Sequence, residues 1–251
     1  MIHMEHVHRR FGRFVALADV TLDVARGESV ALWGGNGAGK STLIRCVLGL
    51  HRFQGRISVD GLDVLRHGKE TRGRIGYVPQ ELGFYDDLRA AEALCFFARL
   101  KGIRRLDAAV ALDAVGLAAH GRKRIRELSG GMKQRLALAV ALLGDPPLLI
   151  MDEVTASLDV MGRRELVALL AGLRQGGRTL LFASHRPEEI AGLADRCVVM
   201  KAGRVELECD PQCVLEEELA PLRGAAPPPR AFADHEPGVA LRCGLAAGGA
   251  A

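Results

Sequence analysis

The sequence predicts an α/β protein in which helices cover a mainly parallel β-sheet. Short apolar runs, typical of buried strands, alternate along the chain with segments of helical pattern, and this alternation is typical of a parallel sheet. The composition, 49% apolar and 25% charged residues in 251, is that of a globular protein with a sizeable core. The net charge of +4 is too small to indicate nucleic acid as a partner.

Each expected element follows from its local pattern. Residues 1–33 alternate strand-like runs with turns, and 29–33 is a short apolar run before a glycine-rich segment. Alanine, leucine and arginine dominate residues 88–143, so we expect 84–144 to form a mostly helical insertion between two strands. The other expected elements are a helix from the glycine-rich segment to about residue 50, strands at 55–59, 75–78 and 148–151, a helix at 162–174, a strand at 178–183, a helix at 187–193 and a strand at 196–200.

The composition changes near residue 222. Residues 223–251 hold three consecutive prolines and many alanines and glycines, with few large apolar side chains. Such a segment buries too little surface to offset its ordering entropy, so we expect one domain over 1–222 followed by a disordered tail. No apolar run approaches the roughly 18 residues of a membrane span, and the first residues lack a signal-peptide pattern. We therefore expect the protein in the cytosol.

A phosphate-binding loop is the most specific feature of the chain. Residues 34–41 match G-x-x-x-x-G-K-[ST] between an apolar run and a helical stretch, which is the context that this motif requires. The glycines allow successive backbone N–H groups to face phosphate oxygens, and the helix directs its positive end at them. Lys40 is expected to reach the β- and γ-phosphates, and the Ser41 hydroxyl to bind Mg²⁺. The expected ATP-binding residues here are Gly34, Gly35, Asn36, Gly37, Ala38, Gly39, Lys40, Ser41 and Thr42.

Two carboxylates follow the apolar run at 148–151. Asp152 would lie at the carboxyl edge of the sheet beside the phosphate loop, where we expect it to hold Mg²⁺ through water. Glu153 is the candidate general base for an attacking water. Two acids after an apolar strand mean little alone. Together with the phosphate loop, they predict a site for nucleotide hydrolysis.

A third motif indicates a family. Residues 128–135 read Leu-Ser-Gly-Gly-Met-Lys-Gln-Arg and lie between the phosphate loop and the two acids. This string resembles the signature of the ATP-binding-cassette (ABC) ATPases, and the resemblance extends over about residues 2–208. It implies a P-loop NTPase fold with a RecA-like parallel core, an antiparallel β-subdomain and the helical insertion. It also implies a head-to-tail dimer in which Ser129, Gly130 and Gly131 contact the γ-phosphate of ATP held by the opposite subunit.

The resemblance assigns roles to further residues. Phe11 is placed where an aromatic ring stacks on adenine, with Phe14 as the alternative, and Asp159 lies in the loop that crosses the dimer interface. Gln80 matches the glutamine that senses Mg²⁺ and the attacking water, and His185 the histidine that contacts the γ-phosphate. The chain departs from the family pattern at Val154, where proline usually follows the catalytic glutamate, and at Gly35 in the phosphate loop. Neither departure removes a catalytic group, so we expect them to affect the rate of ATP hydrolysis and not the reaction itself.

The function implied is that of the ATP-hydrolysing subunit of an ABC transporter, with ATP and Mg²⁺ as cofactors. The expected partners are a second ATPase subunit, in a homodimer, and a separate transmembrane permease at the cytoplasmic face of the inner membrane. Residues 96–102 resemble exporter-type cassettes, including those for copper-enzyme maturation in nitrous oxide reduction. Two alternatives stay open: a soluble ABC-type ATPase without a transport role, and a weakly hydrolysing regulatory subunit.

Two clusters of polar residues allow two interpretations each. The basic run at 122–126 predicts either contact with lipid head groups or a membrane subunit, or a solvated helix end. The three histidines at positions 3, 6 and 8 suggest metal handling, although exposed imidazoles on an edge strand are favoured.

Overall fold

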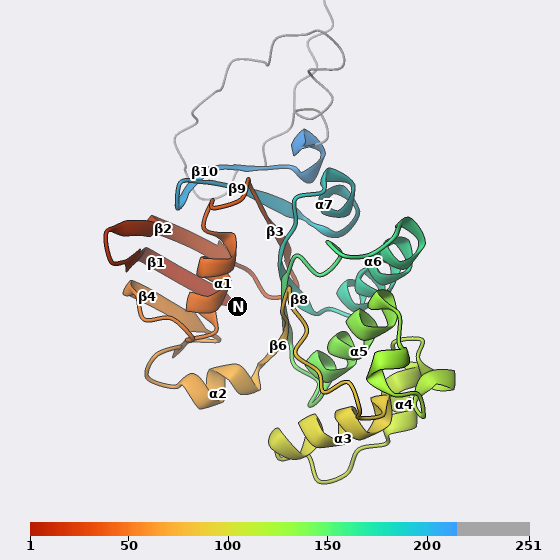
Figure 1. Cartoon of the computed structure of the whole chain (residues 1–251). Helices are drawn as coiled ribbons and strands as arrows, with labels where there is room; N and C mark the ends of the chain where they lie inside the picture. The colour runs from red at the N-terminus through yellow and green to blue at the C-terminus, as the bar shows by residue number, and fades with distance from the viewer. Residues whose placement is uncertain (215–251) are drawn as a thin grey trace, which may run out of the picture.

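The computed structural model describes residues 1–214, which form two β-sheets with helices between and beside them (Figure 1). The tail expected at 223–251 and its boundary at residue 222 lie outside the described residues. The strands are β1 (Ile2–Phe11), β2 (Phe14–Val24), β3 (Ser29–Trp33), β4 (Gln54–Val59), β5 (Leu62–Asp63), β6 (Ile75–Val78), β7 (Leu148–Asp152), β8 (Thr179–Ala183), β9 (Arg196–Lys201) and β10 (Arg204–Cys209). The helices are α1 (Lys40–Val47), α2 (Gly68–Gly73), α3 (Ala90–Leu100), α4 (Ala108–Asp113), α5 (Gly130–Leu142), α6 (Val160–Gln175) and α7 (Pro187–Leu193), with 3₁₀ turns η1 (Ala118–His120) and η2 (Ile125–Glu127).

The larger sheet confirms the predicted parallel arrangement. Its six strands lie in the order β10-β9-β3-β8-β7-β6, and every neighbouring pair is parallel except β10 with β9. Every residue of β7 and β8 is buried, which explains why these strands are continuous apolar runs without alternation. The loops that follow β3, β6, β7 and β8 meet at one edge of this sheet, because parallel strands place their carboxyl ends together.

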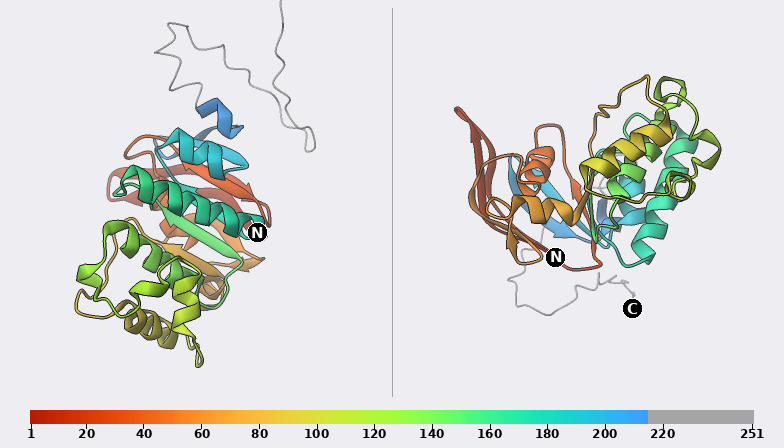
Figure 2. Two further views of the ribbon diagram at one scale, coloured as in Figure 1. Left: turned by 90° about the vertical axis from the view of Figure 1, so that its right-hand side faces the viewer. Right: turned by 90° about the horizontal axis from the view of Figure 1, so that it is seen from below.

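The smaller sheet is antiparallel, with strand order β2-β1-β4-β5. Helix α1 lies between the two sheets, as the view from below shows (Figure 2). One buried cluster joins Ile2 and Val20 of the small sheet to Leu43 and Ile44 of α1 and to Val198 of the large sheet. The phosphate loop and its helix are therefore held by apolar packing on both sides.

The helical insertion lies between β6 and β7 and packs beside α6, away from the antiparallel sheet (Figure 1). The insertion is mostly helical, as expected, and is divided into short elements: α3 ends before Gly102 and α4 before Gly116. Both glycines have positive φ, +75° and +70°, a conformation that ends a helix and that glycine adopts without steric cost. The insertion is thus a set of short helices around the longer, largely buried α5.

Two arginines of the basic run at 122–126 pair with one aspartate of the chain. Arg126 lies 2.9 Å and Arg124 3.5 Å from Asp87, and the backbone N–H of Ile125 donates to the carbonyl of Leu88. These contacts connect the segment before α3 with the segment before α5. Both arginine side chains are about half exposed, at the 3₁₀ turn η2.

The N-terminal histidines lie on an exposed face of the small sheet and contact carboxylates. His3 contacts Asp23 and Glu5, and the hydrogen bond to Asp23 raises the pKa of His3. His6 lies 2.8 Å from Asp19. Among residues 1–214, no group of three or more histidine, cysteine, aspartate or glutamate side chains is arranged to hold a metal ion. The expected edge strand is wrong, because β1 lies between β2 and β4 and pairs with both.

Candidate active site

The phosphate loop follows β3 and turns sharply into α1. Gly34 has φ +152°, and a Cβ there would lie 2.3 Å from the carbonyl oxygen of Met200. Gly39, directly before α1, has φ +106°, and a Cβ there would lie 2.8 Å from the carbonyl oxygen of Ala16. Neither position accommodates a side chain without a backbone shift. The glycines of the motif are therefore required by the path of the chain, as well as by the close approach of a phosphate.

Lys40 is almost fully enclosed, with 5% of its side chain exposed. Its ammonium donates hydrogen bonds to the carbonyl oxygens of Gly34, at 2.7 Å, and Gly35, at 3.3 Å. The nearest carboxylate oxygen, Oε1 of Glu153, lies 3.5 Å away. The first turn of α1 thus places a desolvated cation inside the loop, facing the residue proposed as general base.

Asp152 and Ser41 form an oxygen-rich pair at the end of β7. The Ser41 hydroxyl donates to Oδ1 of Asp152 at 2.9 Å. The second oxygen, Oδ2, is buried and has no hydrogen-bond partner among the described residues. Burial is the main cause that raises the pKa of Asp152, and the negative charge of Glu153 adds to it. Carboxylate, hydroxyl and amide oxygens are the donors that Mg²⁺ prefers, so these residues fit that ion.

Replacing Asp152 with asparagine should raise the melting temperature of the nucleotide-free, metal-free protein at pH 8. Because the pKa of Asp152 is raised in the folded protein, its ionised carboxylate lowers the free energy of unfolding at pH values above that pKa. Below the pKa of about 3.9 in the unfolded chain, the carboxyl is protonated in both states and this loss of stability is absent. Asparagine carries no charge at either pH and can still accept from Ser41. The gain in melting temperature should therefore shrink as the pH is lowered from 8 toward 4. Equal melting temperatures of the wild type and Asp152→Asn at pH 8 would contradict the conclusion that ionised Asp152 destabilises the fold.

Three side chains converge on the carboxylate of Glu153. The amide nitrogen of Gln80 lies 3.4 Å from Oε2, Nδ1 of His185 lies 3.7 Å from the same oxygen, and Lys40 faces Oε1. Glu153 itself adopts φ +49°, and its N–H donates to the carbonyl of Ala183 at the end of β8. A left-handed non-glycine residue costs about 1 kcal/mol or more, and such strain concentrates at functional sites. This turn aims the carboxylate across the edge of the sheet.

A cavity of about 210 Å³ lies directly above the phosphate loop. It is lined by Phe14, Ala16, residues 36–42, Gln80 and Glu153. Phe11, expected to stack on adenine, is not among the lining residues: its ring makes an edge contact with His51, and the Arg9 guanidinium lies 4.3 Å from its centroid. Phe11 is 42% exposed, and the role expected for it at adenine stays a prediction. The alternative, Phe14, is the aromatic side chain at the cavity.

The signature residues lie apart from this cavity. Ser129 is the N-cap of α5 and accepts a hydrogen bond from the N–H of Met132, and both Ser129 and Gly130 are exposed. A Cβ on Gly131 would meet Leu158, so the start of α5 adjoins the loop that ends at Asp159. Asp159 caps α6 by accepting from the N–H of Gly162 at 2.8 Å. Ser129, Gly130, Gly131 and Asp159 therefore share a surface that does not line the chain's own cavity.

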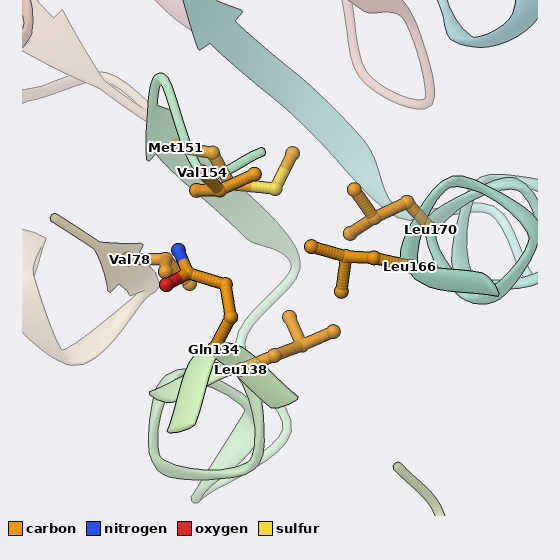
Figure 3. Close-up of a pocket in the computed structure, with 7 residues that line it drawn as sticks. All are labelled: Val78, Gln134, Leu138, Met151, Val154, Leu166 and Leu170. Atoms are coloured by element: carbon orange, nitrogen blue, oxygen red, sulfur yellow. The ribbon is translucent and has the colours of Figure 1, made fainter. Parts of the chain in front are cut away.

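Val154 stands where the family pattern has proline, and the structure shows what it contacts. Its side chain is buried against a small apolar gap between α5 and α6 (Figure 3). The loop after Glu153 is thus anchored by apolar packing on two helices. The residues that line this gap are Val78, Gln134, Leu138, Met151, Val154, Leu166 and Leu170.

Comparison with known sequences identifies similar ATP-binding proteins. A family model described as "ABC transporter" matches residues 17–156. The linearmycin resistance ATP-binding protein of Bacillus subtilis is 34% identical over 82% of this chain and 68% of its own length. A sulfate/thiosulfate import ATP-binding protein of Burkholderia mallei is 38% identical over 86% of this chain and 64% of its own length. Both relatives are named as ATP-binding proteins, whereas the compounds in their names differ.

Solved structures carry the same fold. A cassette in a dimeric post-hydrolysis state, bound to ADP and Pi, is 26% identical, with a TM-score of 0.74 over 84% of this chain and 98% of that chain. CbiO1 from Clostridium perfringens, part of the ABC transporter complex CbiONQ, is 30% identical, with a TM-score of 0.77 over 88% and 93%. The predicted fold class, a P-loop NTPase with a parallel core, is confirmed by these likenesses and by the sheet order.

Proposed function

The chain belongs to the ABC transporter family, as an ATP-binding subunit with the ATPase site of that family, and from this premise we propose how its residues divide the work. Lys40 and the phosphate loop bind the β- and γ-phosphates of ATP. Phe11 stacks on adenine, with Phe14, which lines the cavity, as the alternative. Ser41, Asp152 and Gln80 would hold Mg²⁺, which neutralises charge on the phosphate oxygens when it is bound. The observation that carries this proposal is the convergence of Lys40, Gln80 and His185 on Glu153.

Hydrolysis proceeds by attack of water on the γ-phosphorus. Glu153 orients the water and accepts its proton as the new P–O bond forms and the bond to the β-phosphate oxygen breaks, so ADP and phosphate leave. Gln80 fixes one carboxylate oxygen through its amide, and His185 donates toward the γ-phosphate. Because Lys40, Gln80 and His185 all lie close to Glu153, the geometry favours a hydrolysing subunit over a weakly hydrolysing regulatory one.

The proposed active species is a head-to-tail homodimer. Ser129 and Gly130 are exposed and do not line their own cavity, so they are available to a second copy. There they would close on the γ-phosphate held by the partner subunit's loop, with Asp159 at the crossing. The likeness to a dimeric cassette bound to ADP and Pi supports this arrangement.

A transmembrane permease is the proposed second partner. None of the helices within residues 1–214 combines the length and the apolar character that a membrane crossing requires. The helical insertion, by contrast, exposes large apolar side chains: Tyr85 at 72%, Phe96 at 43% and Leu100 at 68%. We place the permease contact on this surface, with the subunit peripheral at the cytoplasmic face of the inner membrane. The alternative, a soluble ATPase without a transport role, would leave this apolar surface without a use.

Replacing Ser129 with arginine tests the shared site. The variant monomer should bind ATP with wild-type affinity, because Ser129 is remote from its own cavity. Dimer formation with a non-hydrolysable ATP analogue should be lost, and hydrolysis should fall at least about tenfold, a barrier change of ~1.4 kcal/mol. Nucleotide titration measures ATP binding, gel filtration measures dimer formation, and phosphate release measures hydrolysis.

Ala119→Arg is the matched control, since Ala119 is an exposed position of the same insertion. Losing the N-cap at Ser129 costs α5 about 1 kcal/mol, which the melting temperature reports separately. A Ser129→Arg protein that dimerises with the analogue as the wild type does would refute the shared site.

A further inference from the structure

Glu189 is a buried carboxylate outside the nucleotide cavity. It lies in α7 with 7% of its side chain exposed, and none of the roles above involves it. A buried charge persists only when it is paired and hydrogen-bonded, because its desolvation is otherwise too costly. The partners of Glu189 therefore indicate what the side chain is for.

Two hydroxyls and two guanidinium groups surround this carboxylate. Ser184 donates to Oε2 at 2.8 Å and Thr155 donates to Oε1, and both residues are buried. Nε of Arg163 lies 3.5 Å and Nε of Arg186 3.8 Å from Oε1. The carboxylate thus bridges the segment after β8, the loop after β7 and helix α6 from a single point.

Each bridged segment carries a residue of the proposed site. Thr155 lies two residues after Glu153, and Ser184 directly precedes His185. Arg163 also donates to the carbonyl of Leu158 at 3.1 Å, directly before Asp159. We propose that Glu189 is a positioning residue that sets the relative placement of Glu153, His185 and Asp159. This inference rests on the proposed function, because it acts through those three side chains.

Placement of this kind matters because the contacts at Glu153 are long. Nδ1 of His185 lies 3.7 Å from Glu153, with neither side chain held by a direct short bond to the other. A displacement of about 1 Å at a reacting group can lower a rate by roughly 10²-fold. Ser184 is adjacent to His185, and Thr155 lies two residues after Glu153. A displacement of either hydroxyl therefore displaces the neighbouring site residue as well.

Glu189→Gln is the direct test, and Glu188→Gln is its matched control. The two glutamates are adjacent in α7, but Glu188 is exposed. Glutamine keeps the volume of Glu189, but its amide NH₂ cannot accept a hydrogen bond, so one hydroxyl loses its acceptor. We expect kcat for ATP hydrolysis to fall by about 10- to 100-fold in Glu189→Gln, with KM and equilibrium ATP binding within about twofold of wild type. Glu188→Gln should match the wild type in all three.

A double-mutant cycle separates positioning from general destabilisation. If Glu189 acts partly through His185, then Glu189→Gln should cost much less in a His185→Ala background than in the wild type. A purely structural role predicts equal losses in both backgrounds, together with a loss of ATP binding that follows the melting temperature. Equal losses would overturn the proposal.

Ser184→Ala and Thr155→Val decide the question if Glu189→Gln does not fold. Each removes one hydroxyl donor and leaves the charge pairs in place, so kcat should fall severalfold with KM unchanged. Wild-type kcat in both variants would overturn the proposal. A wild-type protein that binds ATP but hydrolyses none would instead refute the proposed function, so the two failures are distinguishable.

Discussion

Replacing Glu153 with glutamine should lower the rate of ATP hydrolysis by roughly 10²-fold or more and leave a long-lived ATP-bound dimer. The amide keeps the shape of the side chain, and its carbonyl oxygen can still accept from Gln80. It cannot take a proton from the attacking water, so bond formation to phosphorus loses its base. The residues proposed to hold ATP and Mg²⁺, among them Lys40 and Asp152, are unchanged, so binding should persist.

The experiment compares hydrolysis and dimer lifetime in the same two proteins. Phosphate release gives the rate, and gel filtration with ATP or ADP gives the dimer, which should appear with ATP alone. Because Val154 replaces the usual proline, the wild-type rate has to be measured alongside. Glu70→Gln, at an exposed position of α2, is the control. Wild-type hydrolysis in Glu153→Gln would assign the base elsewhere, with His185 as the next candidate.

Replacing Lys40 with alanine should weaken ATP binding by about 100-fold or more, which corresponds to roughly 2.7 kcal/mol. The Lys40 side chain is 5% exposed, so its charge acts on the phosphates at short range and with little screening by water. No other lysine or arginine lines the cavity. Alanine therefore removes the cation without a substitute.

Equilibrium titration with a fluorescent ATP analogue measures this loss, with Lys69→Ala as the control because Lys69 is exposed on α2. The melting temperature should be measured on both variants, since Lys40 also bridges the carbonyls of Gly34 and Gly35. A folded Lys40→Ala protein with wild-type nucleotide affinity would refute the role of the phosphate loop.

The elements that could be predicted are those whose signal is local. The apolar runs at 29–33 and 75–78 became β3 and β6, and the helix expected at 187–193 became α7. The loop motif and the two acids could be identified because each is contiguous and stands at a strand end. Gly102 and Gly116 could have revealed the breaks in the insertion, since isolated glycines in a helical pattern favour helix ends.

Contacts between distant segments could not be predicted. The ring of Phe11 contacts Arg9 and His51, and the sequence pattern around the hairpin does not indicate that His51 lies beside it. The sequence does not distinguish Glu189 from its neighbour Glu188, and only the contacts of Glu189 with Ser184 and with Arg163 of α6 do so. Sequence patterns identify side chains that are able to bind or catalyse. Tertiary packing decides which of them are buried, paired and close to one another.

The position of the insertion has an evolutionary consequence. The chain leaves the sheet after β6 and returns at β7, and these strands are direct neighbours, with Ile75 opposite Leu148. The segment between them is inserted at one place, but α5 packs against β6 and α6. A lineage can therefore exchange the part before α5, and with it the surface proposed for the permease, without rebuilding the nucleotide core. Ser129 lies inside the same segment. Any such exchange has to keep the start of α5 intact. Otherwise the changed subunit would contact its transporter but would not complete the active site of its partner subunit.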